Sequence, residues 1–256
     1  MRRFVVFAIL CLAAAVATQA RAQAAAAPDC NPVSDLIFSG AQPLLRQIGR
    51  GARRVHFVMN GADRAGCPNA LAACVGRAFL VHGDLVVVTG TTGDYACAAF
   101  TGRAPGARPS SGWLPRAALF PVSPARHVEQ QADDDWLGDW RYGSEQRIRI
   151  RHMPDGRMKL DGDATFGGHD PARVQRGAVN TGDFAAIVAP ASGYLGFLVG
   201  DKGETLPYDA QRAKDQILCG LRMWRAGPYL VVADNLQCGG NNVTFTGFYR
   251  RHGKPS

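Results

Sequence analysis

The cysteines constrain this chain more than any other feature. The sequence holds seven, and six of them follow residue 24, where a predicted leader ends. An even number of cysteines in an exported protein is typical of a disulfide framework, although six cysteines allow many pairings. Buried free thiols are the alternative, and zinc is not expected because no two cysteines have C-x-x-C spacing. The six are Cys30, Cys67, Cys74, Cys97, Cys219 and Cys238.

Residues 1–24 have the three-part layout of a secretory signal peptide. Arg2 and Arg3 form a positive start, residues 4–16 are an apolar stretch, and A-x-A cleavage motifs follow within 20–24. A membrane anchor needs about 20 apolar residues, which is more than this stretch provides. We therefore expect a periplasmic or secreted product that does not span a membrane after cleavage.

The formal charge is +8, and it falls to +5 without the leader because Arg2, Arg3 and Arg21 leave with it and no acid does. A mildly basic exported protein can attract anionic envelope polymers, although solubility alone also explains such a charge. Nucleic acid is not an expected partner outside the cell. The arginines between residues 46 and 54 are a candidate contact with an anion, or else a solvated face.

The cysteines divide into a group of four before residue 100 and a group of two after residue 218. A stretch rich in proline and charged residues, without apolar periodicity, separates the two groups and is typical of a linker. We therefore predict a signal peptide at 1–24, an N-terminal extension at 25–53, a first domain at 54–124, a linker at 125–135 and a second domain at 136–252. Within the extension, residues 43–49 predict one short helix, since Pro43 suits a first helical position and Gly49 can end it.

Two short motifs lie between residues 54 and 122. Gly83-Asp84 precedes a valine-rich strand, and Gly112-Trp113-Leu114 is followed by Ala117-Ala118-Leu119. In these motifs the segment resembles bacterial SH3-like domains. The resemblance implies a small five-stranded barrel in which Trp113 lies in the core or lines a groove. It also implies a targeting role, since family members accompany cell-wall enzymes. The motif that binds proline-rich peptides in eukaryotic relatives is not visible, and the cysteines depart from the common bacterial pattern.

The second half is predicted to be an antiparallel β domain. Residues 147–151 alternate strictly between arginine and isoleucine, which is typical of a half-buried strand. Strands are predicted at 217–223 and 229–232 around a turn, and 243–249 predicts a closing strand. The fold class is therefore mainly β, with an SH3-like small barrel followed by an antiparallel β-barrel or sandwich.

The hairpin in this half supports one disulfide. If the chain turns near Gly227, Cys219 lies opposite about Asp234, and Cys238 follows four residues later in the loop. A bond between Cys219 and Cys238 stabilises the fold by about 3 kcal/mol in the chain-entropy model. The remaining cysteines are paired here as Cys67 with Cys74, which encloses a small loop, and Cys30 with Cys97.

Gly138-Asp139-Trp140 opens the second domain, and Tyr249-Arg250-Arg251 lies near its end. This arrangement is similar to that of lipocalins, in which a tryptophan on the first strand meets an arginine near the end of the chain. The resemblance implies a barrel that carries a small ligand, although the domain is short for that family. The pattern from Leu230 to Asn241 also resembles C-terminal domains of uncharacterised secreted bacterial proteins, which implies no activity.

The sequence lacks the motifs of familiar enzymes. Neither G-x-S-x-G nor S-x-x-K occurs, and the surroundings of Cys30 and Cys238 do not match wall-acting cysteine enzymes. The six histidines are scattered without H-E-x-x-H spacing. Carboxylates are numerous enough for a glycosidase pair, but sequence does not show which of them converge. We predict no catalytic residue, no metal site and no cofactor, and favour a protein that is not an enzyme.

Arg147, Arg149 and Arg151 are the candidate binding residues. A period of two places them on one strand face with Ile148 and Ile150 inward. Such a row can hold phosphate or carboxylate groups through paired hydrogen bonds. The alternatives are a solvated face or a charged strand edge that prevents unwanted pairing.

These features predict an exported, disulfide-bonded, non-enzymatic protein that binds a component of the cell envelope. The expected partner is peptidoglycan or another cell-wall glycan, an anionic polymer, or an envelope protein, including a hydrolase that the chain inhibits. The alternatives are a wall-acting hydrolase with catalytic carboxylates and a lipocalin-like carrier. Convergent carboxylates in a cleft would favour the hydrolase. An empty apolar barrel would favour the carrier, and a filled core would favour the binding protein.

Overall fold

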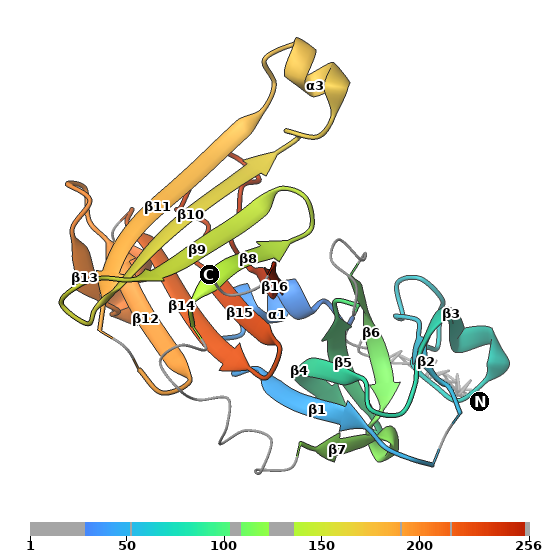
Figure 1. Cartoon of the computed structure of the whole chain (residues 1–256). Helices are drawn as coiled ribbons and strands as arrows, with labels where there is room; N and C mark the ends of the chain where they lie inside the picture. The colour runs from blue at the N-terminus through green and yellow to red at the C-terminus, as the bar shows by residue number, and fades with distance from the viewer. Residues whose placement is uncertain are drawn as a thin grey trace, which may run out of the picture.

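The computed structural model describes residues 29–51, 53–102, 109–122, 136–189, 191–215 and 217–253. They form a mainly β protein with two antiparallel regions, an open seven-stranded sheet and a nearly closed nine-stranded barrel (Figure 1). The predicted mainly β class, with a second antiparallel barrel, is therefore confirmed. The predicted signal peptide and the predicted linker at 125–135 lie outside the described residues.

The seven-stranded sheet comes from the first half of the chain. Its strands are β1 (Leu44–Ile48), β2 (Val55–Val58), β3 (Val75–Leu80), β4 (Leu85–Thr92), β5 (Tyr95–Phe100), β6 (Ser110–Pro115) and β7 (Leu119–Pro121). They lie in the order β3-β2-β6-β5-β4-β1-β7. The central strands β4 and β5 are buried on both faces: Val86 and Val88 pack in the core of this sheet, whereas Val87 packs against the barrel. Continuous runs of valine and alanine are what such strands require.

The barrel comes from the second half. Its strands are β8 (Gly138–Tyr142), β9 (Gln146–His152), β10 (Met158–Phe166), β11 (Asn180–Val188), β12 (Tyr194–Val199), β13 (Thr205–Pro207), β14 (Cys219–Ala226), β15 (Tyr229–Asp234) and β16 (Gly247–His252). Their order is β11-β10-β9-β8-β16-β15-β14-β12-β13, so the first and last strands are neighbours. A hydrogen bond of 2.9 Å from Ile187 N to Thr205 Oγ1 links the two ends of this order. The closing strand begins at Gly247, four residues later than predicted.

The barrel interior is filled with side chains. Phe184 packs edge-on against Phe245, with 4.9 Å between the ring centroids, and also contacts Phe197. The guanidinium groups of Arg225 and Arg251 lie 4.5 Å and 4.9 Å from the centre of the Trp140 ring. The other buried members of this core include Trp136, Met158, Leu160, Leu195, Leu221, Met223, Leu230 and Tyr249. Among the described residues, these side chains form one continuous buried cluster.

The predicted helix at 43–49 is wrong, because Leu44–Ile48 form strand β1. Pairing with β4 on one side and β7 on the other decides the conformation of this short apolar run. The short helix lies earlier, in α1 (Pro32–Phe38), where the Asn31 side chain accepts a hydrogen bond from Ser34 N and proline occupies the first position. The other described helices are α3 (Pro171–Gln175) and α4 (Ala210–Asp215), and none of the three is long and apolar enough to cross a membrane.

All three predicted disulfides are present: Cys30–Cys97, Cys67–Cys74 and Cys219–Cys238. The predicted register of the last hairpin needs a correction, since Leu221, not Cys219, lies opposite Asp234. The pairing still holds because Cys238 returns toward the start of β14, which brings the two Cα atoms to 4.5 Å. Three disulfides are a feature of proteins from oxidising, extracytoplasmic compartments.

Helix α1 lies between the sheet and the barrel and helps to join them. Leu36 is fully buried in a cluster that includes Val87 of the sheet together with Val231 and Phe248 of the barrel. The Leu36 carbonyl accepts a hydrogen bond of 2.8 Å from Arg222. Between the same two regions, the Tyr229 hydroxyl donates a hydrogen bond of 2.6 Å to the Leu85 carbonyl. The two regions therefore share a buried interface.

Two buried tyrosines, Tyr229 at this interface and Tyr249 in the barrel core, predict sensitivity to alkaline pH. Burial raises the pKa of Tyr229, and it raises that of Tyr249 well above the ordinary value of 10.0. A raised pKa means that the folded state holds the proton more tightly, so the stabilisation is complete below pH 10 and is lost as pH rises further. We expect tyrosinate absorbance to appear in two stages, the later one coinciding with loss of circular dichroism. Titration of all six tyrosines near pH 10 in a folded protein would contradict this.

Candidate functional site

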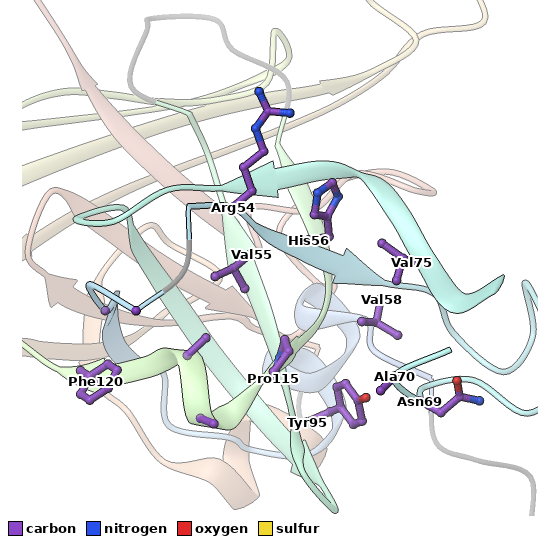
Figure 2. Close-up of a pocket in the computed structure, with 14 residues that line it drawn as sticks. Arg54, Val55, His56, Val58, Asn69, Ala70, Val75, Tyr95, Pro115 and Phe120 are labelled. Atoms are coloured by element: carbon purple, nitrogen blue, oxygen red, sulfur yellow. The ribbon is translucent and has the colours of Figure 1, made fainter. Parts of the chain in front are cut away.

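A groove of about 520 Å³ lies on the seven-stranded sheet (Figure 2). One wall is formed by Val55 and Val58 of β2 with Val75 of β3, and the opposite wall includes Tyr95 and Pro115. The remaining lining residues are Gly49, Gly51, Arg54, His56, Asn69, Ala70, Ala117, Ala118 and Phe120. The groove is therefore mostly apolar, with a few polar groups, which is typical of a ligand site.

One end of the groove depends on a glycine. A Cβ atom at Gly49 would lie only 2.2 Å from a ring carbon of Phe120, so a larger residue there would displace the ring from this position. Phe120 follows the 3₁₀ turn Arg116–Ala118 and is 52% exposed. An aromatic ring that is half exposed beside a groove can stack on a sugar or pack against a peptide.

Two polar groups of the lining, Arg54 and His56, lie just before β2 and within it. The guanidinium of Arg54 lies 4.3 Å from the centre of the Phe79 ring, and His56 packs against the same ring at 5.5 Å. His56 Nδ1 lies 2.9 Å from the Gly76 carbonyl, a position that suits donation and leaves Nε2 for a ligand. In Figure 2 the side chains of Arg54 and His56 extend on the same side, away from Tyr95, Pro115 and Phe120.

The segment that builds this wall is strongly basic. Residues 46–77 contain six arginines and one acid, Asp63. Arg54 lies at the groove itself, and Arg50, Arg53 and Arg77 are exposed nearby in the chain. An apolar groove flanked by guanidinium groups can hold a ligand that combines an apolar body with carboxylates or phosphates.

The predicted arginine row has the orientation expected of it. Ile148 and Ile150 are buried, and the three arginines that alternate with them point outward from β9. Arg147 Nε donates to Asp139 Oδ1 at 3.0 Å, and Arg151 forms an ion pair of 2.6 Å with Asp161.

Neighbouring carboxylates therefore neutralise two of the three arginines. Partial burial alone would raise the pKa of Asp139, but hydrogen bonds and charge from Arg147 and Arg141 lower it. The pKa of Asp161 is lowered in the same way by Arg151 and Lys159. Arg149 lies opposite both of these aspartates in the strand register. Anion binding by Arg147, Arg149 and Arg151 stays a prediction, and the groove is the better candidate.

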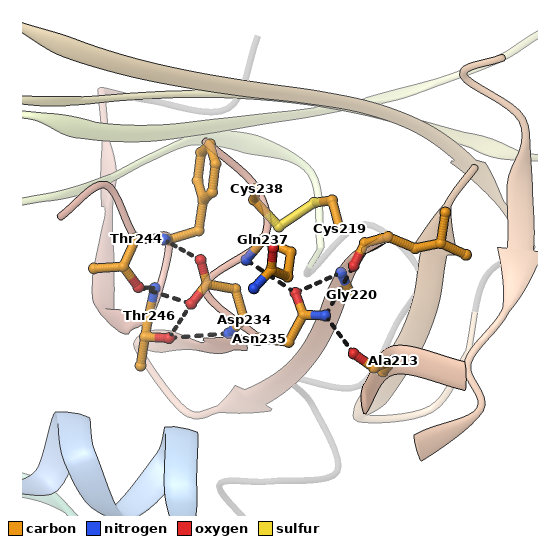
Figure 3. The surroundings of a disulfide bond; sticks show 11 residues. Ala213, Cys219, Gly220, Asp234, Asn235, Gln237, Cys238, Thr244 and Thr246 are labelled. Atoms are coloured by element: carbon orange, nitrogen blue, oxygen red, sulfur yellow. Dashed lines mark hydrogen bonds between the residues drawn. A yellow bond between two sulfur atoms is a disulfide. The ribbon is translucent and has the colours of Figure 1, made fainter. Parts of the chain in front are cut away.

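A buried carboxylate, Asp234, lies beside the Cys219–Cys238 disulfide (Figure 3). Its oxygens accept hydrogen bonds from Phe245 N at 2.8 Å and from the hydroxyls of Thr244 and Thr246 at 2.7 Å each. Each carboxylate oxygen is thus occupied by groups of the same chain. The cluster holds the segment before β16 in place, which is a structural role.

Other chemistry has no visible basis in the described part of the chain. The six cysteines considered above are all in disulfides and so cannot act as nucleophiles. Among the described residues, no group of three or more histidine, cysteine, aspartate or glutamate side chains is placed to hold a metal ion. No protein-family model, curated protein or solved structure is significantly similar to this chain.

Proposed function

We propose that this chain is an exported, non-enzymatic protein that binds peptidoglycan through the groove on its seven-stranded sheet. The observation that carries the proposal is the apolar groove, with Tyr95 and Phe120 in its lining, beside a segment with six arginines and one acid. Peptidoglycan combines sugar rings and short aliphatic side chains with free carboxylates, and these match the two parts of the site.

The strand pairing supports an SH3-like origin for this region. Strands β7, β1, β4, β5 and β6 are neighbours, and the β2–β3 hairpin extends the sheet from the connection between β1 and β4. Trp113 of β6 is 3% exposed and packs beside the two disulfides of this region. A five-stranded arrangement with a core tryptophan agrees with the resemblance, and it supports a role as a wall-targeting module.

The barrel supports the same proposal over a carrier function. A carrier needs an internal cavity, whereas the aromatic side chains Phe184, Phe197 and Phe245 occupy the barrel interior here. The contact between Trp140 and Arg251 is the one that the lipocalin resemblance implies. It joins the first and last strands of the barrel, β8 and β16. We propose that the barrel serves as a rigid support for the sheet through their shared interface.

Replacing Phe120 with alanine is expected to weaken co-sedimentation with purified peptidoglycan about tenfold, because the ligand loses an aromatic contact worth about 1.4 kcal/mol. Phe120 is half exposed, so the folded state should tolerate the change. The matched control is Phe38→Ala, which removes an even more exposed phenylalanine that does not line the groove. Equal pelleting of the two variants, or no pelleting of the unmodified mature protein, would exclude the groove as a wall-binding site.

A further inference from the structure

A second cleft, of about 720 Å³, adjoins the groove on the far side of Tyr95. The two share Tyr95, Pro115 and Ala117 in their linings and are therefore adjacent. Its remaining lining residues are Leu44, Arg46, Val88, Thr91, Asp94, Ala96, Arg116 and Leu119. Unlike the first groove, this cleft contains two guanidinium groups.

Backbone hydrogen bonds hold the two arginines of this cleft. Arg46 on β1 is half-buried, and its Nη1 donates to the Leu45 carbonyl at 2.9 Å. Arg116 is exposed, and its Nη1 donates to the Gly93 carbonyl at 3.2 Å. Each guanidinium has five N–H donors, so most of them stay available for a ligand. Among the described lining residues, Asp94 is the one carboxylate, and it offsets only part of the positive charge.

We propose that this cleft is a carboxylate subsite for the peptide stems of peptidoglycan. Arg46 and Arg116 bind free carboxylates of the stem, and Thr91 is the neighbouring hydroxyl. A planar guanidinium binds a carboxylate through two parallel hydrogen bonds, which a lone lysine cannot provide. The uncharged part of the same ligand lies in the first groove, beyond Tyr95. This inference rests on the function proposed above and adds the group that the site recognises.

The test compares native peptidoglycan with peptidoglycan whose carboxylates have been converted to amides. We expect the mature protein to bind the amidated polymer at least tenfold more weakly than the native one. The double variant Arg46→Gln with Arg116→Gln should bind both polymers equally and weakly. The matched control is Arg64→Gln with Arg176→Gln, which removes the same charge from two exposed arginines outside both clefts. It should keep the preference for native peptidoglycan.

Four outcomes would overturn the subsite. Equal binding of both polymers by the mature protein would leave the groove as a wall site without carboxylate recognition. An equal loss in the control variant would show that overall charge, rather than this cleft, sets the preference. Loss of binding after phosphate polymers are stripped from the wall, with no effect of amidation, would assign the anion to phosphate. No pelleting at all would reject the proposed function together with the subsite. Thermal melts of both double variants establish that the comparison is made between folded proteins.

Discussion

Removing the Cys30–Cys97 disulfide through a double substitution to alanine is expected to lower the free energy of unfolding by about 4 kcal/mol. The two cysteines are 67 residues apart, so the bond restricts a long loop in the unfolded chain. Both are buried in the first region, next to Trp113. The bond also fixes the residues that lead into α1, so its loss should weaken the packing of this helix between the sheet and the barrel. Urea unfolding followed by circular dichroism measures the effect.

The Cys67–Cys74 disulfide provides the matched control for this measurement. It also lies in the first region, but its cysteines are only 7 residues apart. The same model gives a smaller loss of about 2.5 kcal/mol for its removal. Equal losses for the two double variants would show that local contacts, and not loop closure, account for the stabilisation.

Replacing Asp234 with alanine is expected to cost about 3 kcal/mol, the second large effect. The substitution removes the acceptor for Phe245 N and for two threonine hydroxyls in a place where water does not reach. A buried donor that loses its partner carries the full cost of its desolvation. Asp234→Asn keeps the shape and one carbonyl oxygen, so its loss should be about half as large.

The control for Asp234 is Asp201→Ala, at an exposed turn. It should change the free energy of unfolding by less than about 0.5 kcal/mol, as is usual for surface positions. If Asp234→Ala unfolds at the same urea concentration as this control, the buried cluster contributes nothing to stability. The three-donor network would then be a consequence of the fold and not a cause of it.

Several strands of the barrel could be predicted because their pattern is local, whereas β11, β12 and β13 were not predicted. Residues 147–151 alternate apolar and charged side chains, and the turn near Gly227 fixes the hairpin that follows. The helix predicted at 43–49 failed for the opposite reason. Five residues with three apolar side chains fit a helix or a strand equally well, and only pairing with β4 and β7, which come later in the chain, selects the strand.

The groove could not be predicted in the same way. Its lining comes from at least four separate stretches and consists mainly of glycine, alanine and valine, which carry no chemical signature. The one signal in the sequence was the group of arginines between 46 and 54, which includes residues of both clefts, Arg46 and Arg54. The arginines of β9 showed a clearer sequence periodicity. Periodicity does not reveal, however, that aspartates on the neighbouring strands pair with them.

The position of α1 joins the first described residues to strands that come much later in the chain. Leu36 is among the first residues of the described chain, yet the arginine that donates to its carbonyl lies 186 residues later. Until β14 and β15 have folded, the face of α1 that packs against them is exposed. The interface between sheet and barrel therefore forms only when distant parts of the chain come together. Such contacts form slowly because the intervening chain must first be brought together. A product released early, before the barrel strands emerge, would therefore present an apolar surface to other chains.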